Sequence, residues 1–362
     1  MAQSAETFLQ QGALLQSQKK YLEAITEYTA ALTIKPDYHS AFYNRGSVLF
    51  LLKSYELALK DFNEAIALKP DFFEAYNNKA TLLMTTKRLD EALECYDQSI
   101  QVNPNYPASY GNKAVLLNAM GRYHDAIETC DKVIAFKPDF YLAHYSKGEA
   151  LRALGDLEGA LLCFEKAIEA KSDFKQAYYG KLETLQRLGK FEESLECTEK
   201  VIAMNPADFK AVYEKALLLQ DLGKLEDSVG VLDQVISMKP DFFEAYKIKG
   251  LILDNMGKFE KAVEALNKYL EFIPNDSHAH FVKGMNLEDL KKNEEAIESY
   301  DKAININPGN PNFYSKKGKL LEALGKKEEA KECYKKALDF EPTNPDFKSN
   351  LENLLKVNEK DD

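Results

Sequence analysis

The chain has 362 residues, of which 45% are hydrophobic and 29% are charged, and its formal net charge is −11 at pH 7. This negative charge argues against a nucleic-acid-binding surface, because phosphate recognition needs clustered Lys and Arg without compensating acids. The sequence has no apolar run near the roughly 20 residues of a membrane span, and residues 1–8 lack the basic and apolar parts of a signal peptide. We therefore expect a cytoplasmic protein that binds neither nucleic acid nor membrane.

A proline recurs every 34 residues along almost the whole chain. The series is Pro36, Pro70, Pro104, Pro138, Pro206, Pro240, Pro274, Pro308 and Pro342, and Ser172 takes the proline's place in phase. A fixed period of this length indicates one supersecondary unit repeated in tandem, each copy too small to bury its own apolar face. We number positions 1 to 34 in each repeat, with the proline at position 32. After a lead-in of residues 1–4, ten repeats are predicted at 5–38, 39–72, 73–106, 107–140, 141–174, 175–208, 209–242, 243–276, 277–310 and 311–344.

Each repeat predicts a pair of helices. Positions 4, 8 and 11 fall on one face of a helix, and positions 20, 24 and 27 fall on one face of a second. Position 11 is Leu in all ten repeats, position 4 is mostly aromatic, position 8 is usually Gly or Ala, and position 20 is Ala or Ser. The small residues at positions 8 and 20 are expected to let the two backbones approach closely.

Residues with special backbone preferences mark the predicted helix ends. Gly at position 15, present in six repeats, suits a left-handed end to the first helix. The proline at position 32 stops the second helix, and the Asp or Asn that follows, such as Asp37 or Asn105, is expected to cap the next helix.

The tail predicts one more helix. Phe347, Leu351, Leu354 and Leu355 follow i, i+4, i+7, i+8 spacing, so they form one apolar face. Residues 345–362 are therefore expected to form a capping helix over the last repeat, followed by an acidic tail.

These recurring residues resemble the signature of the tetratricopeptide repeat family, which has an aromatic residue at position 4, Leu, a small residue at 8, Ala at 20, an aromatic residue at 24, Ala at 27 and Pro at 32. The resemblance covers residues 5–344. It implies an all-α fold, a right-handed superhelical solenoid of antiparallel helix pairs. It also implies that the first helices line a concave groove that binds peptides or protein partners.

The cysteines and histidines do not suggest a metal or catalytic site. Four cysteines share position 23 and Cys130 lies at position 24, without any CxxC pair, so we expect reduced thiols that pack as small apolar side chains. His278 and His280 are two residues apart and therefore point to opposite sides of a helix, with His280 at core position 4. The sequence has no nucleophile elbow or phosphate loop. We predict no cofactor, no metal, no catalytic residue and no enzymatic activity.

Candidate binding residues lie at positions 2, 5, 6, 9, 12 and 13, a stripe of the first helix that we call the inner stripe and that faces the groove in the family. Position 6 is Asn in three successive repeats, at Asn44, Asn78 and Asn112. An amide both donates and accepts, so such a row can pair with the backbone of an extended peptide. The row is similar to the asparagine ladder in the repeat domain of O-linked N-acetylglucosamine transferase.

Further along, the inner stripe changes chemistry. Position 5 becomes Tyr145, Tyr179 and Tyr213, with Glu149 and Glu183 at position 9, and the far end carries acids such as Asp221 and Asp254. Aromatic rings beside negative charge suit a basic or proline-containing segment. The two-carboxylate clamp that holds chaperone C-terminal tails in some family members is absent, because the bases it needs are missing, for example at Leu9 and Ala108.

A basic row at position 7, in nine of the ten repeats, runs parallel to an acidic row at position 25. We expect the two rows to neutralise each other rather than to form a track for polyanions.

The preferred function is a protein–protein interaction scaffold that holds extended segments of partner proteins in its groove. Two alternatives stay open: a structural subunit of a larger assembly that docks through its outer surface, and an accessory subunit that presents substrates to a separate enzyme. The Asn and Tyr rows could also be inherited by duplication and merely solvate the inner surface.

Overall fold

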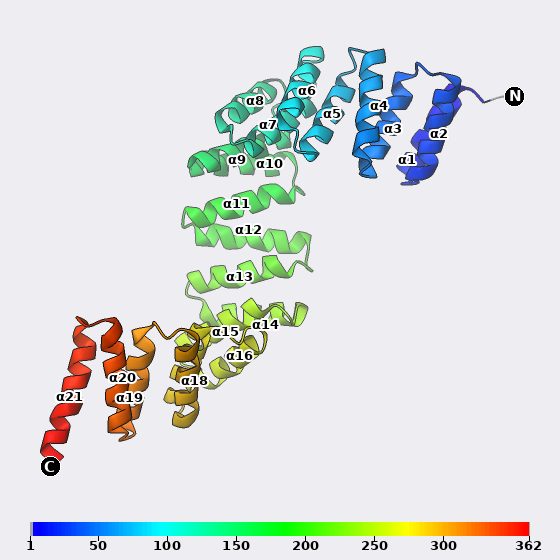
Figure 1. Ribbon diagram of the computed structural model, residues 1–362. Coiled ribbons are helices and arrows are strands. Elements are labelled where there is room, and N and C mark those ends of the chain that lie inside the picture. Colours follow the sequence, from blue (N-terminus) through cyan, green and yellow to red (C-terminus); the bar gives the residue numbers. More distant parts are fainter. Residues whose placement is uncertain (1–2, 362) are drawn as a thin grey trace. The chain divides into compact units, whose positions relative to one another are not determined.

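The computed structural model describes residues 3–361, with side chains described for residues 3–355. These residues form twenty-one helices and no strand (Figure 1), which confirms the predicted all-α class. The chain divides into two compact units, Met1–Lys190 and Phe191–Asp362. None of the described helices is both long enough and apolar enough to cross a membrane.

The first unit holds repeats 1 to 5 and the first helix of repeat 6. Its helices are α1 (Ala5–Ser17), α2 (Tyr21–Ile34), α3 (His39–Leu51), α4 (Tyr55–Leu68), α5 (Phe73–Thr85), α6 (Leu89–Val102), α7 (Pro107–Ala119), α8 (Tyr123–Phe136), α9 (Tyr141–Leu154), α10 (Leu157–Ala170) and α11 (Lys175–Arg187).

The second unit begins with the second helix of repeat 6 and continues to the tail. Its helices are α12 (Phe191–Met204), α13 (Phe209–Asp221), α14 (Leu225–Met238), α15 (Phe243–Asn255), α16 (Phe259–Phe272), α17 (Ser277–Asp289), α18 (Asn293–Ile306), α19 (Pro311–Ala323), α20 (Lys327–Phe340) and α21 (Pro345–Asp361).

In both units, helices that are adjacent in the chain pack against each other as hairpins. In the first unit, the first helices of successive repeats also contact one another from α1 through α3, α5, α7 and α9 to α11, and in the second unit α15 contacts α17. Among the described helices, no two second helices approach each other to the same extent. In the first unit, the first helices therefore lie on the closer, inner side.

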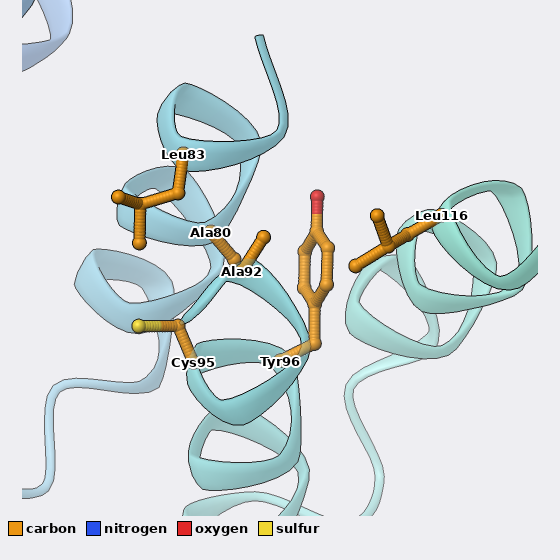
Figure 2. Close-up of a cluster of buried hydrophobic side chains, with 6 residues drawn as sticks. All are labelled: Ala80, Leu83, Ala92, Cys95, Tyr96 and Leu116. Atoms are coloured by element: carbon orange, nitrogen blue, oxygen red, sulfur yellow. The ribbon is translucent and has the colours of Figure 1, made fainter. Parts of the chain in front are cut away.

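The predicted core positions are buried. Positions 20, 24 and 27 are buried in every repeat, and position 11 is buried in nine of ten. Figure 2 shows this arrangement in repeat 3, where the ring of Tyr96 stands between the small residues Ala80 and Ala92 and Leu116 of the next repeat. Apolar burial of this kind is the main favourable contribution to folding.

Positions 3 and 10 are core positions that the sequence analysis did not identify. Both are buried in repeats 2 to 10, as at Ala41 and Val48, but exposed in repeat 1, where they are Thr7 and Leu14. Their burial therefore depends on a preceding repeat. Positions 3 and 10 form the contact between neighbouring repeats, whereas positions 4, 8 and 11 form the contact between the two helices of one repeat.

The small residue at position 8 makes room mainly for a ring. A Cβ atom added to Gly12 would lie 2.6 Å from Tyr28 Cε1, and one added to Gly284 would lie 2.6 Å from Tyr300 Cε1. The expected close approach of the two backbones is confirmed at Gly284, where an added Cβ would lie 3.3 Å from the backbone oxygen of Ala296 at position 20. The nearest atoms, however, belong to the position 24 side chain, which occupies most of the space that the missing side chain leaves.

Position 15 adopts the predicted left-handed conformation in all ten repeats. The six glycines there have φ between +69° and +89°, and Lys19, Lys53, Lys87 and Lys291 have φ between +60° and +64°. The predicted caps at position 33 are wrong, because each first helix starts one residue later and its N-cap is position 34. That residue is often aromatic, as in Phe72, and a side chain caps the helix where position 34 is polar, as in Asp276.

The basic and acidic rows pair across repeats, which confirms their mutual neutralisation. Six lysines at position 7 lie 2.5–2.7 Å from the acid at position 25 of the preceding repeat. Arg45 instead binds Asp61 of its own repeat with two hydrogen bonds of 2.7 and 2.8 Å. Position 25 is Asn instead of an acid in the repeats before Lys79 and Lys283, at Asn63 and Asn267, and burial lowers the pKa of Lys283.

The tail covers the last repeat as predicted. Phe347 and Leu354 of α21 are buried, and Leu354 joins Leu321, Ala330 and Tyr334 in one apolar cluster. The side chains of the predicted acidic tail lie outside the described residues.

Two glycines provide a matched test of packing between repeats. A Cβ at Gly180 would lie 2.6 Å from the buried ring of Phe164, whereas a Cβ at exposed Gly230 meets nothing within 4 Å. We expect Gly180→Ala to lower the free energy of unfolding by about 1–3 kcal/mol through overpacking. Gly230→Ala should raise it by about 0.5–1 kcal/mol, since alanine is favoured inside a helix. Thermal and urea unfolding of both variants would measure this, and equal effects would contradict the packing described.

His280 gives a second prediction. Its side chain is buried, its Nε2 atom lies 3.0 Å from the carbonyl oxygen of Pro274, and burial lowers its pKa below the ordinary value of 6.5. The fold therefore favours neutral His280. The contribution of neutral His280 to the free energy of unfolding is fully present above pH 6.5 and is lost as the pH falls through the folded-state pKa. When the pH is lowered from 7.5 to 5, the free energy of unfolding measured with urea should fall less in His280→Phe than in the natural chain. If the free energy of unfolding falls equally in His280→Phe and in the natural chain, His280 does not have this role. The control is His124→Gln, a change at an exposed site.

Candidate functional site

The asparagine row lies on the inner side of the first unit. Asn44, Asn78 and Asn112 are on α3, α5 and α7, and each is half-buried. They occupy the same position in consecutive first helices that contact one another. The structure therefore brings the three amides onto one surface at a spacing of one repeat.

Two of the three amides are held by position 5 of the preceding repeat. Asn78 Nδ2 donates to Tyr43 Oη at 3.0 Å, and Asn112 Nδ2 donates to Asn77 Oδ1 at 3.0 Å. Within the described residues, the Asn44 side chain makes no hydrogen bond, and the same is true of Asn112 Oδ1. The row thus combines amides of fixed orientation with polar atoms that are open to a ligand.

The tyrosines at position 5 do not share one environment. Tyr145 meets the edge of Phe174 with ring centroids 5.2 Å apart, and Tyr213 meets Phe242 in the same way at 5.0 Å. Burial raises the pKa of both phenols. Tyr179 is 41% exposed, so it offers more ring surface. Tyr213 belongs to the second unit.

Glu149 and Glu183 are balanced by arginines that the sequence analysis did not consider. Arg152 donates to Glu149 at 2.8 Å and also pairs with Glu183, while Arg187 donates to Glu183 at 2.8 Å. The Arg152 side chain is only 16% exposed. The expected excess of negative charge beside Tyr145 is therefore absent from this network, which holds two acids and two bases.

The acids of the second unit occupy different settings. Asp221 is exposed, whereas Asp254 is half-buried and accepts a hydrogen bond of 2.8 Å from Asn286. Burial raises the pKa of Asp254. Glu288 and Glu322, at position 12 of the last two repeats, accept hydrogen bonds from the hydroxyls of Tyr300 and Tyr334. These two acids thus help to orient rings at core position 24.

A basic hollow at the end of the inner stripe was missed by the sequence analysis. It has a volume of about 460 Å³ between α17 and α19, and its lining includes His278, Phe281, Asn312, Ser315, Lys316 and Lys319. The sequence analysis noted only the acids at positions 12 and 13 in this region. The bases at positions 6 and 9 of repeat 10 could have been found by the same alignment of positions.

The cysteines behave as core residues, as predicted. Cys95, Cys130, Cys163 and Cys197 are buried, and burial raises the pKa of Cys130 to about 12. In residues with described side chains, no three His, Cys, Asp or Glu residues gather in a way that could hold a metal ion.

Sequence profiles of the tetratricopeptide repeat match nearly the whole array. Profiles described as TPR repeat or tetratricopeptide repeat match residues 12–53, 39–72, 73–106, 95–128, 112–174, 179–241, 213–277, 288–325 and 311–344. No curated protein sequence matches the chain.

The chain is similar to several solved structures. MamA from Desulfovibrio magneticus RS-1 is 23% identical over 46% of this chain and 95% of its own, with a TM-score of 0.44. YrrB, described as a TPR protein with an unusual peptide-binding site, is 24% identical over 50% of this chain and 94% of its own, with a TM-score of 0.44. A tetratricopeptide repeat protein from Parabacteroides merdae ATCC 43184 is 17% identical over 69% of this chain and 98% of its own, with a TM-score of 0.47.

The family assignment rests on the repeat profiles and on the helix hairpins described above. Arrays of this kind generally act as non-catalytic scaffolds for protein interactions. The chain belongs to the tetratricopeptide repeat family.

Proposed function

We propose that the inner stripe of the first unit binds an extended segment of a partner protein, with Asn44, Asn78 and Asn112 pairing with the segment's backbone. Backbone pairing needs donors and acceptors at regular intervals but does not depend on the partner's side chains. The scaffold would therefore accept segments of varied sequence at this row.

The observation that carries this proposal is the unequal hydrogen bonding of the row. Neighbouring side chains hold the amide nitrogens of Asn78 and Asn112, so these side chains have little orientational freedom left to lose on binding. The side chain of Asn44 and the side-chain oxygen Oδ1 of Asn112 have no hydrogen-bond partner among the described residues, and both residues are half-buried. A bound backbone would satisfy these polar atoms.

The stretch around Tyr179 suits a proline-bearing part of the same segment. Tyr179 is the most exposed of the three inner tyrosines, and an aromatic face packs well on a proline ring. Because arginines balance Glu149 and Glu183, a basic residue of the partner would have to compete with Arg152 and Arg187 there. Asp221 and Asp254 in the second unit are the better candidates to meet a basic residue.

The double variant Asn78→Ala plus Asn112→Ala tests the proposal against a library of ten-residue peptides. Each hydrogen bond contributes about 0.5–1.5 kcal/mol, so binding of selected peptides should weaken about 5-fold to 100-fold. The matched control is Asn63→Ala plus Gln98→Ala, which removes two exposed amides from the second helices α4 and α6 and should leave binding unchanged.

Recovery of partners from a cell extract gives the contrary outcome. If the Asn78→Ala plus Asn112→Ala chain stays folded by circular dichroism and recovers the same partners with the same yield, the inner stripe is not the recognition surface. That result would favour a structural subunit that docks through its outer face.

A further inference from the structure

The hollow between α17 and α19 combines an apolar floor with basic side chains. The rings of Phe281 and Phe313 lie together in its lining, with centroids 4.8 Å apart. Lys316 and Lys319, one turn apart on α19, lie on the same lining. A volume of about 460 Å³ falls within the range of about 300–1,000 Å³ typical of ligand sites, and is large enough for a few side chains.

The two lysines are poorly compensated by acids. Lys316 Nζ lies 3.5 Å from Glu288 Oε1, a longer separation than the 2.5–2.7 Å of the position 7 ion pairs. Glu288 also accepts a hydrogen bond of 2.7 Å from Tyr300, which holds this carboxylate away from a tighter pairing. Lys319 is exposed and makes no ion pair with any residue whose side chain is described.

Arg152, Arg187 and Lys247, three other bases on the inner stripe, are paired within the fold. Arg152 is paired with Glu149 and Glu183. Lys247, at position 5 of repeat 8, lies 2.7 Å from Asp276. The α17–α19 hollow therefore differs from these sites, because its lysines retain donors that no carboxylate of the chain occupies closely.

Additional polar groups line the same space. His278 and Asn312, both at position 2, are exposed, and Ser315 at position 5 is buried in the floor. Each can donate a hydrogen bond to an oxygen ligand. Two acids adjoin this lining and both have other hydrogen-bond donors. Glu288, 3.5 Å from Lys316, accepts a hydrogen bond from Tyr300, and Asp254 accepts one from Asn286.

We propose that this hollow binds an acidic side chain, Glu or Asp, that neighbours an apolar residue in an extended partner segment. Lys316 and Lys319 hold the carboxylate, and the half-buried ring of Phe281, which packs on the buried Phe313, covers the apolar residue. The inference rests on the proposed function, because it names the partner chemistry that the last two repeats of the same inner stripe select.

Charge complementarity favours this occupant. Hydrogen bonds to a charged group contribute about 1.5–3 kcal/mol, and a carboxylate held by ammonium groups forms the shorter, stronger kind. The adjacent rings exclude water from one side of the contact, which strengthens the attraction between opposite charges. An uncharged amide in the same place would gain neither effect.

Two defined probes test the proposal on the full-length chain. One is a fluorescent ten-residue peptide of alternating Glu and Leu, and the other replaces each Glu with Gln. The natural chain should bind the Glu probe at least about 10-fold more tightly, which corresponds to about 1.4 kcal/mol. Lys316→Gln plus Lys319→Gln should abolish this preference, and Lys319→Gln alone, at an exposed site, should reduce it without affecting the fold.

The matched control is Lys335→Gln plus Lys336→Gln, which removes two exposed lysines from α20 and should keep the preference. Equal affinity for the two probes, no binding of either, or a preference that survives Lys316→Gln plus Lys319→Gln would each overturn the proposal.

The Asn78→Ala plus Asn112→Ala chain separates this proposal from the proposed function of the asparagine row. If library binding is insensitive to that change while the Glu preference remains, the asparagine row fails and the hollow stands.

Discussion

The array depends on one recurring contact, in which the side chain at position 24 fills the space between its own hairpin and the next. Phe164 shows this most clearly, since Gly148 of its own repeat and Gly180 of the following repeat both face its ring. A Cβ atom at either glycine would come within 3 Å of the ring. The contact couples the spacing of the two helices within a repeat to the spacing between repeats, and close-packed interiors do not tolerate a change in either.

This packing determines which surface remains for recognition. The core uses positions 4, 8 and 11 within each repeat and positions 3 and 10 between repeats. The inner stripe is the more exposed part of the first helix, although its position 6 is buried at Ser146, Gly180 and Val282. Neighbouring repeats then interact along it, through Asn77 with Asn112 and through Arg152 with Glu183. The inner stripe is therefore an ordered polar surface whose chemistry changes along the chain, from amides to tyrosines, then to acids, with two lysines added in the last repeat.

The period of the sequence was sufficient to predict the hairpins, the core positions and the left-handed position 15, because each depends on residues within one repeat. Properties that depend on two repeats were harder to predict. The pairing of Arg152 with Glu183 joins side chains 31 residues apart, and it cancels a charge that had been expected to attract basic partners. The caps at position 33 were misplaced by one residue, since an aromatic residue such as Phe72 serves as N-cap without any side-chain hydrogen bond.

The most direct test of the account is site-specific photo-cross-linking to partners in a cell extract. A photoreactive phenylalanine derivative would replace Asn112 on the inner stripe in one chain and the exposed Glu94 on the second helix α6 in another. The account predicts that partner proteins cross-link at position 112 and not at position 94. Cross-linking at position 94 with none at position 112 would contradict it, because recognition would then occur on the outer face.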